Sequence, residues 1–243
     1  MGGIWLRRKL SWLLVAVLLV VVAAEFLIPL ALEHRVKVLL ENRLLQAENL
    51  DVRIQSRPAA ASFLGRFRRI FIHAQNFSTA DLLVDEFTVA GEHVRLDPRK
   101  LYNGGEVSVQ RARDLRVSVA LSEAGINQYM WDKIDPERRL EVIINPDGAV
   151  LKGNINFFGH GIDVYLKGGF EIRNQSQLIF VPETLTMEQL EVPSVILNAL
   201  VEDRALLVDL AALPVPLALD EVRLEEGRLS AFGHYAEFAE EGR

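Results

Sequence analysis

The first part of the chain combines an apolar run with basic residues in front of it. Residues 10–24 are almost entirely aliphatic and follow three basic residues at 7–9. A second apolar stretch, 26–32, comes after Glu25. The first stretch alone would span only ~22 Å as a helix, whereas both stretches together span ~34 Å, enough for the ~30 Å hydrocarbon core of a bilayer. The pattern predicts a signal or anchor segment over residues 1–32, with one acidic residue inside it.

This segment has two interpretations, and both keep the basic flank in the cytoplasm. It is typical of a signal peptide cut after the small residues Val22-Ala23-Ala24. It is equally typical of a retained anchor, in which Glu25 lies near the outer interface and flanking charges reach the headgroups. The chain has no Cys, so a lipid-modified lipoprotein is excluded. Either interpretation places residues 33–243 on the extracytoplasmic side of the cell membrane.

Helical spacing continues directly beyond the membrane segment. Glu33, Lys37 and Glu41 follow one another at four-residue steps, which is typical of a solvated helix face. The apolar residues of 32–47 share another face. They are Leu32, Val36, Leu39, Leu40, Leu44 and Ala47. We therefore expect an amphipathic helix that leads straight out of the membrane.

Alternation of apolar and polar residues dominates the remainder and predicts many half-buried strands. The clearest case is 115–121, where Leu115, Val117, Val119 and Leu121 alternate with Arg116, Ser118 and Ala120. The other expected strands are 52–54, 67–73, 87–89, 94–96, 140–144, 149–157, 162–167, 170–173, 178–181, 217–224 and 229–232.

Turn and cap residues connect these strands. Asn145-Pro146-Asp147-Gly148 predicts a hairpin, 158–161 a second one, and Gly168-Gly169 a bulge or bend. Ser122 is a candidate cap for a short helix at 124–134, and a second short helix is expected at 195–202. We expect one α+β domain over 33–243, with mainly antiparallel strands.

Composition narrows the class of protein. Half of the 243 residues are apolar, which excludes a disordered chain. The net charge is −6, with 17 Lys and Arg against 12 Asp and Glu in residues 1–120, and 10 against 21 in 121–243. Such an acidic second half argues against nucleic acid as a partner. The absence of Cys and the presence of only five scattered His lead us to expect no metal and no cofactor.

The predicted elements raise a packing problem. One helix is ~10 Å wide, whereas the strands of a sheet repeat every ~4.8 Å, so three helices cannot cover all the expected strands. The sheet must curl around the long helix, pack on itself, or keep apolar surface for a guest. A guest with acyl chains suits a site beside a membrane, because each buried methylene contributes ~0.8 kcal/mol. A sheet closed on its own side chains would give the same alternation.

Short motifs in a consistent order cover most of the chain past the membrane segment. They are the helix at 32–45, Asp51-Val52-Arg53-Ile54, Gly65-Arg66-Phe67, residues 153–159, 162–169, Phe180-Val181-Pro182-Glu183, Val192-Pro193-Ser194 and 222–229. In this order and spacing the chain resembles the LmeA-like phospholipid-binding family, bacterial extracytoplasmic proteins related in fold to the tubular lipid-binding superfamily. The resemblance implies a long helix cradled by a curled sheet, an elongated apolar groove for phospholipid, and binding without catalysis.

The resemblance transfers no individual site residues, so the candidate site rests on alternation and charge. For the acyl groove we expect the helix to contribute Val36, Leu39, Leu40 and Leu44. Facing them we expect Val117, Val119, Ile155, Phe157, Ile162, Val164 and Leu166. Each of these residues is equally compatible with an ordinary core.

Two arginine clusters are candidates for anionic groups. Arg66, Arg68 and Arg69 surround Phe67 and are expected to hold a lipid phosphate, since Arg binds phosphate bidentately. They are also compatible with a charged strand edge. A second cluster, Arg111, Arg113 and Arg116, is a candidate for contact with an anionic membrane surface.

Catalytic motifs are scarce. The sequence has no Gly-x-Ser-x-Gly, no His-Glu-x-x-His and no P-loop. His160 with Asp163 is a candidate acid–base pair in a hairpin turn, and Asp132 with Asp135 is a candidate carboxylate pair, although the Asp135-Pro136 step is more typical of a helix end. We therefore expect no enzyme, but a protein that binds phospholipid or a lipid-linked envelope precursor. The main alternative is an anchored adaptor that binds another envelope protein and whose sheet is filled by side chains. A hydrolase using His160 is the third. The sequence identifies no protein partner.

Overall fold

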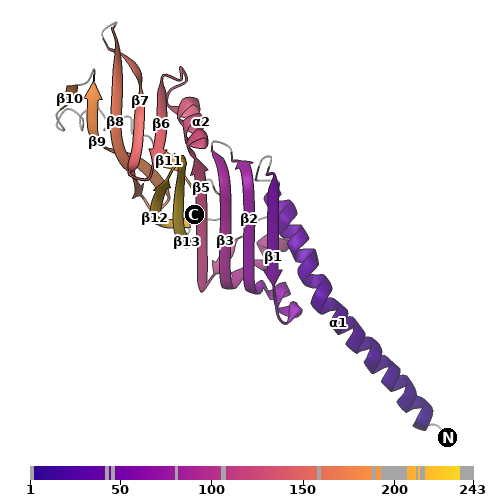
Figure 1. Ribbon diagram of the computed structural model, residues 1–243. Helices are drawn as coiled ribbons and strands as arrows, with labels where there is room; N and C mark the ends of the chain where they lie inside the picture. Colours follow the sequence, from indigo (N-terminus) through magenta and orange to yellow (C-terminus); the bar gives the residue numbers. More distant parts are fainter. Residues whose placement is uncertain are drawn as a thin grey trace.

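The computed structural model describes residues 3–41, 44, 47–79, 82–104, 108–157, 160–187, 190–192, 207–211, 213 and 217–235. It has an α+β fold with a long apolar N-terminal helix, mostly antiparallel sheets of which one is curled into a half-barrel, and few short helices. Figure 1 shows the first half of the long helix projecting away from two sheets that lie side by side. The predicted fold class is confirmed.

One continuous helix, α1 (Gly3–Glu41), contains both the membrane segment and most of the amphipathic helix. Its part from Trp12 to Glu41 is long and apolar enough to cross a membrane. Its side chains are exposed from Trp12 to Val22, and the apolar stripe that begins at Leu32 is buried. The helix ends at Glu41, earlier than predicted, although Leu44 N still donates to Leu40 O at 2.8 Å.

The first sheet has seven strands and holds the α1 stripe. Its order is β1-β2-β3-β5-β13-β12, with β4 paired to β3, and all the pairs are antiparallel. The strands are β1 (Asn49–Gln55), β2 (Arg66–Ser78), β3 (Leu83–Leu96), β4 (Val109–Arg111), β5 (Asp114–Ser122), β12 (Leu217–Glu225) and β13 (Arg228–Tyr235). The alternations expected at 87–89 and 94–96 are two parts of the single strand β3.

The second sheet has six strands, in the order β10-β9-β8-β7-β6 with β11 paired to β9. They are β6 (Leu140–Asn145), β7 (Gly148–Phe157), β8 (His160–Arg173), β9 (Gln177–Met187), β10 (Leu190–Val192) and β11 (Leu207–Asp209). Buried residues of both sheets belong to one hydrophobic core. The strands therefore form two sheets that share a core, where the sequence predicted one curled sheet.

Turn chemistry accounts for the register of the second sheet. Asn145 pairs with Gly148, so Pro146-Asp147 forms the predicted hairpin between β6 and β7. The register of β8 against β9 shifts between Lys167 and Gly168, which confirms the predicted bulge. A Cβ atom on Gly168 would lie 2.1 Å from the carbonyl oxygen of Val181, so this close approach requires glycine.

The described residues also form three short helical segments: η1 (Ala59–Leu64), η2 (Lys100–Gly104) and α2 (Glu123–Lys133). Ser122 caps α2, because its hydroxyl accepts a hydrogen bond from Gly125 N at 3.2 Å. The predicted helix at 124–134 is thus confirmed. The helix expected at 195–202 lies outside the described residues.

Helix α2 joins the two sheets by covering the free edge of β6. Alternate residues of an edge strand leave N–H and C=O groups unpaired, and burying them without partners is costly. In β6 the exposed edge presents the N–H and C=O groups of Leu140, Val142 and Ile144, and all six of these groups have partners. The N–H groups donate from Leu140 to Asp135 (2.7 Å), from Val142 to Asn127 (2.7 Å) and from Ile144 to Glu123 (2.8 Å). The carbonyls accept from Trp131 at Leu140 (2.7 Å), from Asn127 at Val142 (2.8 Å) and from Gly227 at Ile144 (3.0 Å).

Three charged side chains tie α1 to the end of the first sheet that lies nearest the membrane segment. Glu25 accepts both its hydrogen bonds from Ala59 N, at 2.9 and 3.1 Å, at the start of η1. The other two contacts are Glu33 with Ile54 N (2.8 Å), and Arg35 with the carbonyls of Leu101 (3.2 Å) and Tyr102 (2.6 Å). The acidic residue inside the apolar segment therefore has a structural partner in the folded domain.

Candidate functional site

The predicted helix residues line the interior of the first sheet. Val36, Leu40 and Leu44 are each 3% exposed or less, and Leu39 packs half-buried against the same core. Their stripe follows helical spacing, so one side of α1 faces the sheet and the other faces solvent.

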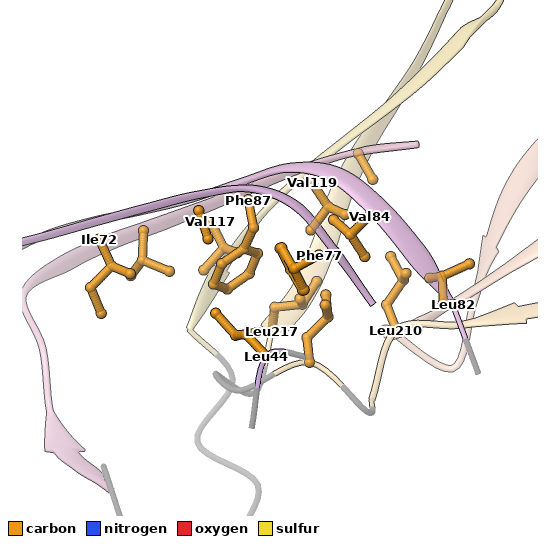
Figure 2. Close-up of a cluster of buried hydrophobic side chains, with 14 of the residues drawn as sticks. Leu44, Ile72, Phe77, Leu82, Val84, Phe87, Val117, Val119, Leu210 and Leu217 are labelled. Atoms are coloured by element: carbon orange, nitrogen blue, oxygen red, sulfur yellow. The ribbon is translucent and has the colours of Figure 1, made fainter. Parts of the chain in front are cut away.

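The two predicted residues of β5 join this cluster. Val117 and Val119 are almost fully buried. Figure 2 shows them beneath the curved strands, with Phe87 next to Val117 and Val84 next to Val119. The structure therefore brings Val36, Leu40, Leu44, Val117 and Val119 into one hydrophobic core.

This interior is filled by the protein's own side chains. Between α1 and the first sheet the described residues border an apolar void of about 20 Å³, which is room for roughly one water molecule. Its lining is entirely aliphatic and consists of Val36, Ile54, Ile70, Ile72, Val89, Val94, Leu96, Val109 and Leu115. A whole acyl chain does not fit there without displacing these side chains.

The predicted residues of β8 lie on the second sheet and not in the α1 cluster (Val36, Leu40, Leu44, Val117 and Val119), although Leu166 packs half-buried against the same hydrophobic core. Ile162, Val164 and Leu166 are half-buried, and the residues between and after them, at 163, 165 and 167, are exposed. Of Ile155 and Phe157 the structure describes only the backbone in β7, and Ile155 pairs with Ile162. The candidate residues are thus divided between two sheets.

Strand register extends the β8 row across three strands. Leu151, Leu166 and Leu185 are aligned in one row, and Val164 is aligned with Met187 in the next. Directly paired residues point to the same side of a sheet. We call this surface the β7–β9 face, and it comprises Leu151, Ile162, Val164, Leu166, Leu185 and Met187. Apart from Leu185, which is 7% exposed, these side chains are only half-buried.

Polar side chains occupy the opposite side of the same strands. An open groove of about 770 Å³ crosses it and is bordered by Trp131 and Tyr165 and by the ion pair between Lys152 and Glu141, 3.3 Å apart. A second open groove, of about 780 Å³, lies over β5 and β13 and is bordered by Arg116 and by His234. Both grooves expose apolar as well as charged groups, and more of their lining is apolar than polar.

The predicted headgroup arginines lie on the exposed side of β2. Arg66 and Arg68 are exposed, while Arg69 forms an ion pair with Glu92 at 3.2 Å. Their strand is in the first sheet, so they do not border the β7–β9 face. Pairing places Arg95 opposite Arg66, and Arg111 opposite Arg95. The sequence could not show this row, because its residues lie far apart along the chain.

Two side chains in and near η2, Tyr102 and Asp97, have shifted pKa values. Burial raises the pKa of the Tyr102 hydroxyl, although the nearby Arg35 charge opposes the shift. The Lys100 N–H, assisted by the Arg99 N–H, holds the pKa of Asp97 below its ordinary value in spite of some desolvation. Both groups belong to the segment that binds α1 through Arg35.

The described residues give little support for a metal site or for catalysis. No group of three or more His, Asp or Glu side chains within them is placed to hold a metal ion. Asp163 accepts a hydrogen bond from Asn154 at 2.8 Å, and the side chain of His160 lies outside the described part.

A model of the LmeA-like phospholipid-binding family matches residues 23–233, and the chain belongs to that family. The match begins just before Glu25, and it covers both sheets. No curated protein and no solved structure matches the chain.

Proposed function

We propose that the protein binds phospholipid without catalysis and that the acyl chains lie on the β7–β9 face. The observation that carries the proposal is the alternation along β8. Ile162, Val164 and Leu166 form a half-buried apolar row next to exposed polar neighbours. A half-open apolar row that runs along three strands matches the extended shape of an acyl chain.

The filled interior of the first sheet supports this location. The void beside Val36 has room for only about one water molecule, so there is little space for an acyl chain among the side chains of the α1 cluster. We therefore treat this cluster as the hydrophobic core of the domain. On the β7–β9 face a lipid would contact side chains that are mostly only half-buried, of which Leu151 and Leu166 also pack against that core. Burying about eight methylenes there contributes ~6 kcal/mol per chain, and two chains contribute about twice as much, comparable with the ~4–15 kcal/mol cost of immobilising a ligand.

Membrane attachment and topology complete the proposal. α1 remains as an anchor, and the basic residues at 7–9 keep its N-terminus in the cytoplasm. The two sheets then lie outside the cell membrane, where the protein accepts or presents a phospholipid or a lipid-linked envelope precursor. Since α1 is tied to the domain through Glu25, Glu33 and Arg35, the site has a fixed position relative to the bilayer.

A paired substitution tests the proposal. Leu166→Glu places a carboxylate on the β7–β9 face, and Tyr165→Glu places the same charge on the opposite side one residue earlier. Full-length protein is purified in detergent, and its phospholipid is extracted and quantified by mass spectrometry. We expect Leu166→Glu to lose several-fold more phospholipid than Tyr165→Glu, because the charge is desolvated only on the apolar face. Equal phospholipid content in both variants and the wild type would contradict the proposal.

A filled first sheet also favours a second function, an anchored adaptor for another envelope protein. In that case the half-open row of the second sheet would contact a protein partner. The same variants separate the two functions, because an adaptor carries no phospholipid that depends on Leu166.

A further inference from the structure

Two neighbouring apolar side chains of η1 are exposed. Outside α1, the described residues include five exposed large hydrophobic side chains, and only Phe63 (56%) and Leu64 (59%) are more than half exposed. They are adjacent at the end of η1. Burying each of them would contribute about 1.5–3 kcal/mol, so a partner that removes them from water is favoured.

The structure holds η1 beside a defined level of the membrane helix. Ala59 N, at the start of η1, donates to the Glu25 carboxylate at 2.9 Å. At the other side of η1, the Tyr102 hydroxyl donates to Ser62 O at 3.3 Å, and its ring stacks on Phe63 with centroids 6.4 Å apart. In Figure 1 this segment lies at the end of the β1–β2 pair that is nearest the free half of α1.

Helix length places that level inside a bilayer. A hydrocarbon core of ~30 Å takes about 20 helical residues, and counting from residue 10, just after the basic flank, the core ends near Leu30. The exposure of the side chains agrees with this boundary, because the apolar residues Phe26, Leu27 and Leu30, which follow Glu25, are 65–70% exposed. Glu25 then lies about five residues, or ~7 Å, inside the boundary. Ala59, at the start of η1, is bonded to Glu25, and Phe63 and Leu64 follow four and five residues later in the same short helix, so they lie within about 10 Å of that level.

A row of arginines follows at the level of the headgroups. Arg66, Arg95 and Arg111 stand opposite one another on β2, β3 and β4, and all three are exposed. Like charges directly opposite one another in a sheet are destabilising. None of the three side chains forms an ion pair or a hydrogen bond with a residue in the described part of the chain. Arg66 is two residues past Leu64, within ~7 Å along an extended chain.

We propose that η1 is a second membrane-contact site, which inserts Phe63 and Leu64 into the leaflet from which α1 emerges and places the arginine row against anionic headgroups. The inserted side chains account for the exposed apolar pair, and lipid phosphates neutralise the repulsion among the arginines. The domain is thereby held against the membrane at two points. This inference depends on α1 entering a bilayer, and it is independent of lipid on the β7–β9 face.

The chain contains no Cys, so single cysteines can be introduced and spin-labelled cleanly. Full-length Phe63→Cys is reconstituted in vesicles of phosphatidylethanolamine and phosphatidylglycerol, and the label's collisions with oxygen and with a water-soluble nickel chelate are compared. Leu27→Cys on α1 serves as the membrane reference and Tyr165→Cys as the aqueous reference. We expect Phe63 to favour oxygen, as Leu27 does, with the opposite preference at Tyr165. Nickel-dominated collisions at both Phe63→Cys and Leu64→Cys would overturn the proposal.

A second spin-label experiment tests whether the arginine row contacts anionic headgroups. In the Phe63→Cys background, the variant Arg66→Gln, Arg95→Gln and Arg111→Gln removes the three charges. We expect a shallower label in vesicles that contain phosphatidylglycerol, and no such shift in vesicles of phosphatidylcholine alone. An unchanged depth in both would exclude the arginines from the contact. If the label at Phe63 inserts into vesicles but the purified protein carries no phospholipid, the proposed lipid site on the β7–β9 face is contradicted, and the membrane contact of η1 is not.

Discussion

Asn127 binds both backbone groups of a single residue, Val142. Its Oδ1 accepts from Val142 N at 2.7 Å, and its Nδ2 donates to Val142 O at 2.8 Å. A side-chain amide carries both a donor and an acceptor, so it can pair with a strand as a neighbouring backbone does. Asn127 is 4% exposed, so these bonds replace water completely. Through this pair α2 attaches the second sheet to the first.

Asn127→Leu should therefore destabilise the protein by about 2–5 kcal/mol, because two buried backbone groups lose their partners. Gln128→Leu is the matched control. Its side chain bonds only Asp132 on the surface, so its effect should be within about 0.5 kcal/mol. Chemical denaturation of the full chain in detergent measures both variants. Equal stabilities would show that the edge of β6 does not depend on α2.

The void beside Val36 provides a test of where lipid binds. Val36→Ile adds one methylene to a void of about 20 Å³, so we expect a gain of up to ~0.8 kcal/mol in stability and unchanged phospholipid content. Val36→Ala should lower the stability by about 1–3 kcal/mol, again without loss of lipid. Denaturation and lipid extraction of the same preparations check both results. A drop in phospholipid in Val36→Ile would place an acyl chain in the first sheet.

Glu25 should control the order of η1. Glu25→Leu keeps the segment apolar but removes the acceptor of Ala59 N, so a spin label at Phe63→Cys should become more mobile. Glu25→Gln retains one acceptor oxygen and should preserve most of the order. Electron paramagnetic resonance line shapes in vesicles measure the difference. If Glu25→Leu leaves the line shape unchanged, other contacts hold η1.

Asp97 makes the η2 segment sensitive to acid. Its folded pKa lies below 3.8 because the N–H groups of Lys100 and Arg99 donate to its carboxylate. A lowered folded pKa contributes stability that is present above pH 3.8 and is lost as the pH falls through the folded value. Asp97→Ala should thus be less stable than the wild type at neutral pH, and the difference should shrink on acidification. A difference that does not vary with pH would contradict this origin.

The sequence predicted elements well where local chemistry decides them. Ser122 capped its helix, Pro146-Asp147 formed its hairpin turn, and the alternation of β5 gave Val117 and Val119 their buried positions. These features depend on neighbours a few residues apart. The predicted row Ile162, Val164 and Leu166 has the expected half-burial for the same reason.

Features that depend on pairing between distant strands could not be predicted. Alternation shows which side of a strand is apolar, but not which sheet the strand joins, so Val164 was expected opposite Val36 and lies on the second sheet. The arginine row requires the registers of β2, β3 and β4. One signal was available: Glu123, Asn127, Trp131 and Asp135 follow four-residue spacing and mark the polar face that covers β6.

The most direct measurement of the central claim is photo-crosslinking from the β7–β9 face. Leu166→Cys and Tyr165→Cys are labelled with a benzophenone in the full-length protein, reconstituted in vesicles of phosphatidylethanolamine and phosphatidylglycerol, and irradiated. The account predicts that mass spectrometry finds a phospholipid adduct at Leu166 that is several-fold more abundant than at Tyr165. Adducts of equal yield at the two positions, or none at Leu166, would contradict it.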